Sequence, residues 1–275
     1  MKKIILCLFL VNLSLFSQQY TERLYDAIED NNTEEIKYIV NEYDIDLNNT
    51  FLRKETPLSG QYEYAYLNFT PLIWAIDCKN LEAIDTLLKL GANLELESRY
   101  YNIRSFSMLP LMVAVNLDEN KKMEKVVSFL MQKGAKIDAK NREGKTALMY
   151  AVCCEGRRVG SINLCRMLIN AGADVHIKDN EGITALMYAA YSHDSECVDL
   201  LIKNNANINE KDKNSAAALI YACKNSSFGL YGSLNPNVVK SLIKAGADVN
   251  VTDNEGNTAL LYAVMIAKEY LSYDG

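Results

Sequence analysis

The sequence predicts an all-α protein in which helix–turn–helix units stack into a solenoid. The main observation is an internal repeat: the string Thr-Ala-Leu-Met-Tyr-Ala occurs unchanged at residues 146–151 and 184–189. It occurs with one change at 258–263, and weaker copies begin at 70, 109 and 217. Self-similarity at a spacing of roughly 20–50 residues is typical of repeat proteins, in which each unit buries its apolar face against its neighbours.

A second string marks the end of each unit, in phase with the first. Gly134, Gly172 and Gly246 are each followed by alanine and lie 12 residues before the position that starts the next unit. Asn205 has the same place in its unit. Glycine and asparagine tolerate the left-handed conformation that ends many helices. The spacing therefore predicts that the second helix of each unit ends at these residues.

The residue types at the start of each unit suit the first turn of a helix. A threonine there, as at Thr146 and Thr184, accepts a hydrogen bond from an N–H group that the helix leaves unpaired. Proline, as at Pro71 and Pro110, fits the first helical position. We therefore expect about seven units within residues 18–275, which start near residues 22, 70, 109, 146, 184, 217 and 258.

These strings resemble the ankyrin repeat, whose period is 33 residues and whose signature is Thr-Pro-Leu-His-x-Ala. The resemblance covers roughly residues 20–275, although an apolar residue such as Met149 replaces the signature histidine in every unit. It implies helix pairs joined by short β-hairpin fingers. It also implies a non-catalytic module that binds a protein partner through the concave face of the first helices and through the fingers.

The fifth position of the first helix carries an aromatic residue in most units. In the family that the chain resembles, this helix flanks the concave surface, so a row of rings would offer a partner an amphipathic strip. The alternative is that the rings only pack between repeats. The candidate partner-binding residues in this row are Trp74, Tyr150, Tyr188, Tyr221 and Tyr262, and Val113 has the same place in the third unit.

Two insertions, at about residues 47–68 and 94–107, lengthen the predicted fingers of the first two units. Because these units are neighbours, we expect the two fingers to lie side by side. Both contain tyrosine and arginine, which are frequent at the centres of protein interfaces. The fingers form either an adhesive patch or a lid whose rings turn inward. The candidates for partner contact are Tyr62, Tyr64, Tyr100, Tyr101 and Arg104.

The first 17 residues differ from the rest of the chain. Lys2 and Lys3 precede an apolar stretch from Ile4 to Phe16, and the small residue Ser17 comes before polar residues. This is the layout of a cleaved secretory signal peptide. The apolar stretch is shorter than the roughly 20 residues that span a bilayer as a helix. We therefore expect export to a periplasmic or secreted location, with no stable membrane span after cleavage.

The charge and the motifs of the chain argue against several classes of function. The chain has 29 Lys and Arg against 35 Asp and Glu, which disfavours binding to the phosphate backbone of nucleic acids. The sequence shows no clear phosphate-binding loop, nucleophile elbow or metal-binding motif. The string Asp-Asn-Glu-Gly at 179–182 and 253–256 is interpreted as a turn, since it lacks the closing glutamate of a calcium loop. The sequence therefore predicts no enzyme, no cofactor and no metal site.

Seven cysteines occur, and one of them, Cys7, lies in the predicted signal peptide. Cys165 and Cys197 fall at apolar positions of the predicted second helices, where a free cysteine behaves as a small hydrophobe. Cys153 and Cys154 are adjacent, and a redox-responsive accessory protein that uses them is one alternative to the binding module. A self-associating structural or envelope spacer is the other alternative.

Overall fold

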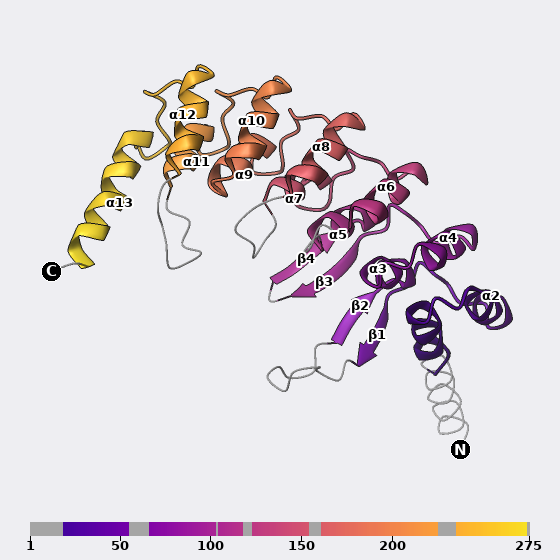
Figure 1. The fold of residues 1–275 in the computed structure, drawn as a ribbon. Coiled ribbons are helices and arrows are strands. Elements are labelled where there is room, and N and C mark those ends of the chain that lie inside the picture. Colours follow the sequence, from indigo (N-terminus) through magenta and orange to yellow (C-terminus); the bar gives the residue numbers. More distant parts are fainter. Residues whose placement is uncertain are drawn as a thin grey trace. The chain divides into compact units, whose positions relative to one another are not determined.

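The structure is a computed structural model of the 275-residue chain (Figure 1). It describes residues 19–54, 66–102, 104–117, 123–153, 161–224 and 235–273, but not the side chains of 51–54, 66–68, 99–102, 104–106 and 267–273. The predicted signal peptide, Tyr62, Tyr64 and Cys154 lie outside the described residues.

Helices follow one another in pairs along the described chain, which confirms the predicted helix–turn–helix class. The first pair consists of residues 19–29 and α2 (Thr33–Glu42). The next pairs are α3 (Pro71–Asp77) with α4 (Leu81–Lys89), α5 (Pro110–Asn116) with α6 (Glu124–Gln132), α7 (Ala147–Val152) with α8 (Ile162–Asn170), α9 (Ala185–Tyr191) with α10 (Ser195–Lys203), and α11 (Ala218–Cys223) with α12 (Pro236–Lys244). The last helix, α13 (Ala259–Tyr273), has 15 residues.

The helix boundaries follow from the residue types that the sequence places there. Pro71 occupies the first turn of α3, and the hydroxyl of Thr184 accepts the N–H of Met187 at the start of α9. The backbone angle φ is 96° at Gly172 and 63° at Asn205, as the predicted left-handed helix ends require. None of the described helices is both long and apolar enough to cross a membrane.

The described residues belong to two compact units. The first lies within Met1–Leu117 and Phe129–Ala135, and the second within Asp118–Ser128 and Lys136–Gly275. The boundary therefore runs through α6.

The two long fingers of the first unit form a four-stranded antiparallel sheet. Its strands are β1 (Phe51–Lys54), β2 (Tyr66–Phe69), β3 (Ser98–Asn102) and β4 (Arg104–Met108), in the order β1-β2-β3-β4. Strands β2 and β3 come from different fingers and pair at Asn68 and Arg99. The prediction that these fingers lie side by side is confirmed.

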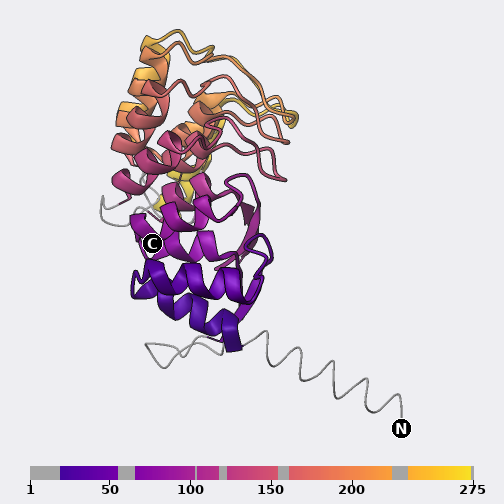
Figure 2. The same ribbon diagram turned by 90° about the vertical axis from the view of Figure 1, so that its right-hand side faces the viewer.

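The second unit contains α7 to α13, and each first helix packs on the next. Helix α9 contacts both α7 and α11, and α11 contacts α13. Each second helix buries one apolar face. In α8 this face consists of Leu164, Cys165 and Leu168. The fingers of this unit project together from one side of its helices (Figure 2). This regular stack positions the fifth residue of each first helix beside the preceding finger.

Candidate partner-binding surface

The row of rings on the first helices is only partly accessible, so it does not form a continuous strip in the described residues. In the first unit, Trp74 is 7% exposed, and its ring packs against Tyr25 and Phe69 at centroid distances of 5.7 and 5.9 Å. Val113 and Tyr150 are each 1% exposed. These side chains fill space between packed elements, so Trp74 and Tyr150 follow the alternative in which the rings pack between repeats.

The accessible part of the row lies in the second unit. Tyr188 on α9, Tyr221 on α11 and Tyr262 on α13 are half-buried, so part of each side chain reaches the surface. The ring of Tyr191 meets that of Tyr221 edge-on at 6.3 Å and extends the row. For these residues, contact with a partner stays a prediction.

Each accessible tyrosine is held by an aspartate from the loop before its helix. The hydroxyl of Tyr188 donates to Oδ2 of Asp179 at 2.7 Å, and the hydroxyl of Tyr221 donates to Oδ2 of Asp212 at 2.6 Å. The same bond recurs at Tyr262, at 2.6 Å. A ring that is tied at its outer end has few orientations left, so these bonds fix the surface.

The second carboxylate oxygen of each aspartate fixes the loop itself. Oδ1 of Asp212 accepts the N–H groups of Asn214 and Ala216, both at 2.8 Å. Asp179 and Asp253 make the same two bonds to the residues two and four positions later. The turn interpretation of 179–182 and 253–256 is confirmed, because these oxygens hold backbone N–H groups and a tyrosine.

The network also sets which partner carries the proton. Burial and the hydrogen bond to Asp212 raise the pKa of Tyr221. Burial alone would raise the pKa of Asp253, but the bonds from Tyr262 and from the N–H groups of Asn257 and Glu255 outweigh it and lower this pKa. Near neutral pH the phenol of Tyr262, whose pKa the bond to Asp253 raises, is therefore the donor and the carboxylate of Asp253 the acceptor.

Sequence reasoning missed these loop residues as part of the site, although a signal was present. An Asp or Asn precedes the tyrosine by nine residues in four consecutive units. The pairs are Asn141 and Tyr150, Asp179 and Tyr188, Asp212 and Tyr221, and Asp253 and Tyr262.

Backbone hydrogen bonds join neighbouring fingers of the second unit. The N–H of Asn180 donates to the carbonyl of Glu143, and the N–H of Lys213 donates to the carbonyl of Glu181, both at 2.9 Å. Gly144 allows this approach, because a Cβ atom on it would lie 2.5 Å from Oδ1 of Asn180. The fingers therefore form one braced surface.

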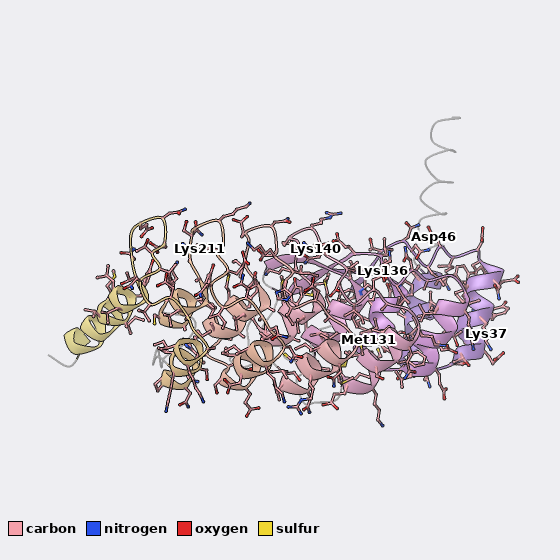
Figure 3. The ribbon with its side chains drawn as sticks, turned by 90° about the horizontal axis from the view of Figure 1, so that it is seen from above. Lys37, Asp46, Met131, Lys136, Lys140 and Lys211 are labelled. Atoms are coloured by element: carbon pink, nitrogen blue, oxygen red, sulfur yellow. The ribbon has the colours of Figure 1, made fainter. Side chains whose placement is uncertain are left out.

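Lysines reinforce the same surface from finger to finger. Nζ of Lys140 donates to the carbonyl of Lys178 at 2.9 Å, and Nζ of Lys178 donates to the carbonyl of Lys211 at 3.1 Å. Figure 3 shows Lys140 and Lys211 apart along the row of fingers, and the finger of Lys178 contacts the fingers of both. Lys178 also pairs with Glu210 at 2.5 Å.

Two further lysines lie between successive rings. Nζ of Lys145 is 5.6 Å from the ring centroid of Tyr150 and 5.4 Å from that of Tyr188. Lys224 lies in the same way between the next two rings, at 5.7 and 5.2 Å. Ammonium groups within about 6 Å of a ring centroid are attracted to the ring face. A positive charge therefore lies beside each of the accessible rings of Tyr188, Tyr221 and Tyr262.

The structure leaves most of the finger candidates of the first unit undecided. Tyr100 and Tyr101 lie in β3 and Arg104 in β4, but their side chains are not among those described. The described finger ring that can be placed, Phe69, is 3% exposed and faces Trp74, as a lid would require. Tyr62 and Tyr64 fall outside the described residues.

The described side chains give little sign of a chemical centre. Within the described ranges, no group of three or more His, Cys, Asp or Glu is placed to hold a metal ion. The thiol of Cys153 is half-buried, and its neighbour Cys154 is not described.

Comparison with known protein families agrees with this geometry. The family described as "Ankyrin repeats (3 copies)" matches residues 96–179 and 156–253, and the family "Ankyrin repeat" matches residues 67–99. No curated protein matches the chain. Because the three-copy family covers more than half of the chain, and the helix pairs repeat in the same phase, the chain belongs to the ankyrin-repeat family.

Proposed function

We propose that the chain is an exported, non-catalytic module that binds a protein partner through the tyrosine row of its second unit. Ankyrin repeats generally mediate protein–protein interaction. The observation that carries the proposal is the set of half-buried rings at Tyr188, Tyr221 and Tyr262, each bonded to an aspartate. Lys145 and Lys224 lie beside these rings.

This row has the properties of an interface centre. A tyrosine presents a large apolar area together with a polar edge, and it orders few torsion angles when it binds. Since the hydroxyls are already fixed by aspartates, a partner does not have to order the rings, which lowers the entropic cost of association. The lysines beside them favour a partner segment that combines apolar side chains with carboxylates.

The proposed export is supported by the first 17 residues. Their two lysines, apolar stretch and small Ser17 are typical of a signal peptide. The partner is therefore to be sought in the cell envelope and the medium.

A charge reversal tests the surface without opening the core. The tagged full chain is used to capture partners from envelope and medium fractions, alongside a Lys145→Glu/Lys224→Glu double variant. We expect the variant to capture at least about tenfold less of the same partner, because each change puts a like charge opposite the partner's carboxylates at the centre of the interface. Quantitative mass spectrometry of the eluates provides the measurement.

The matched control is Lys203→Glu/Lys240→Glu, which makes the same charge change at exposed positions of the second helices. This variant should capture as much as the unchanged chain. Equal capture by all three proteins, or a loss confined to the control, would refute the tyrosine row as the binding surface.

One observation favours self-association as a second candidate. Leu260, Leu261 and Val264 on α13 are 72, 45 and 55% exposed, although Leu186 and Met187, at the first two of these positions in α9, are at most 1% exposed. In the repeats before it, this face is covered by the next repeat. A second copy of the chain, docked on the same face, is the occupant that we propose.

The charge of each face indicates which part of the second copy docks on α13. Residues 259–267 of α13 are uncharged, so two such faces meet without repulsion. The first described helix instead exposes the charged residues Glu22, Arg23, Asp26 and Glu29, and an apolar face docked there would remove these charges from water. Light scattering of the full chain should show a concentration-dependent dimer that Leu260→Glu abolishes. A chain that stays monomeric at all concentrations would exclude this candidate.

A further inference from the structure

Two cysteines from neighbouring repeats touch inside the second unit. Cys165 lies in α8 and Cys197 in α10, and both are 0% exposed. Their Sγ atoms are 3.3 Å apart, and both thiols are free. The sulfur atoms thus meet in the core, where the second helices α8 and α10 of neighbouring repeats pack on each other.

The two positions are occupied by aliphatic residues elsewhere in the stack. Counted back from the buried leucine of each second helix, Cys165 corresponds to Val198 of α10, and Cys197 corresponds to Val238 of α12. Helices α10 and α12 pack on each other, and Val198 and Val238 are both fully buried there. Packing alone therefore does not require sulfur at both facing positions of the preceding interface.

We infer that Cys165 and Cys197 are a disulfide site that links the fourth and fifth repeats when the chain meets a disulfide oxidant. The two thiols lose two protons and two electrons, and one S–S bond replaces two S–H bonds. The electrons reduce the oxidant, a disulfide of a protein or of a small molecule, to two thiols. The Sγ atoms approach from 3.3 Å to the bond length of about 2.05 Å.

The closed core controls when the bond forms. The contact with Cys165 and burial raise the pKa of the Cys197 thiol, so little of the reactive thiolate exists in the folded chain. No oxidant can reach a sulfur atom that is 0% exposed. The exchange therefore takes place while the repeats fold or open, and the finished bond is protected from reductants.

The bond would change how the stack opens. Each repeat of a solenoid contacts only its neighbours, so one interface can separate while the others persist. A link between residues 32 positions apart restricts the unfolded chain and holds α8 against α10. The inference uses the proposed export only as the source of an oxidant, and it is tested without any partner.

The test compares full chain refolded from urea with oxidised and reduced glutathione against chain refolded with excess reductant. Trypsin digestion without reductant should yield the peptides 159–166 and 179–203 joined, and neither contains another cysteine. We expect the linked chain to unfold at a temperature about 10 °C higher than the reduced chain. Free thiols at both residues, or glutathione on either one at the end of refolding, would overturn the inference.

Two kinds of variant separate the bond from ordinary packing. Cys165→Val and Cys197→Val place at each site the residue found at the equivalent position of the next interface, and circular dichroism checks that they fold. Both should lose the temperature difference between oxidised and reduced samples. Cys153→Ser should keep it, since the Cys153 thiol is half-buried and outside the pair. A difference that survives in the valine variants would place the stabilising bond elsewhere.

Discussion

Replacing Leu186 by alanine is expected to lower the free energy of unfolding by about 3 kcal/mol, whereas Leu260→Ala should change it by less than about 0.5 kcal/mol. Both leucines occupy the same position of a first helix, in α9 and α13. Leu186 is 0% exposed and Leu260 is 72% exposed. The first substitution therefore leaves a cavity in a packed interface, and the second removes a side chain that water already contacts.

Urea unfolding followed by circular dichroism measures both changes, at a protein concentration that keeps the chain monomeric. Because the substitution and the helix position are the same, the difference isolates burial. If Leu260→Ala were as costly as Leu186→Ala in the monomer, the face of α13 would have to be covered, contrary to the structure.

Replacing Asp212 by alanine is expected to cost about 3 kcal/mol of unfolding free energy. The change removes the acceptor for the hydroxyl of Tyr221 and for the N–H groups of Asn214 and Ala216, and Asp212 is 8% exposed. Buried donors without an acceptor each carry a desolvation penalty. The finger and the first helix should both become less stable.

Two controls separate the parts of this effect, measured by the same urea titration. Tyr221→Phe removes only the phenol and should cost about 1 kcal/mol. Asp174→Ala, at an exposed aspartate that accepts a single backbone N–H from His176, should cost less than about 0.5 kcal/mol. A loss at Asp174 equal to that at Asp212 would mean that burial of the network does not matter.

The repeat strings predicted the helix pairs because each string marks a local backbone requirement. Thr184 begins a helix and Gly172 ends one through contacts within a few residues, so these positions can be read from spacing. The finger pairing at Asn68 and Arg99 was also predictable, since neighbouring repeats must stack.

Accessibility within the site was harder to predict, because it depends on neighbours in other elements. Tyr150 and Tyr188 share one string and one helix position, yet Tyr150 is 1% exposed and Tyr188 is half-buried. The burial of Trp74 depends on the rings of Tyr25 and Phe69. Tyr25 belongs to an earlier repeat, and Phe69 lies in the finger before the helix of Trp74. A repeated string fixes the place of a ring in its own unit, but not what covers it.

The contact between Cys165 and Cys197 shows the same limit. The apolar position of each cysteine in its helix was evident, and both are buried as expected. Their 3.3 Å separation depends on how two second helices face each other, because the residues sit at positions offset by one along the two helices. Aligning the repeats by their strings compares equivalent positions only, so it does not reveal a contact between two different positions.

Hydrogen–deuterium exchange of the full chain, with and without its captured partner, tests the central claim most directly. If the tyrosine row of the second unit is the binding surface, the partner should slow exchange in α9, α11 and the fingers that carry Asp179 and Asp212. Exchange in α8, α10 and α12 should change little. Protection confined to these second helices, or to the first unit, would contradict the proposed mode of recognition.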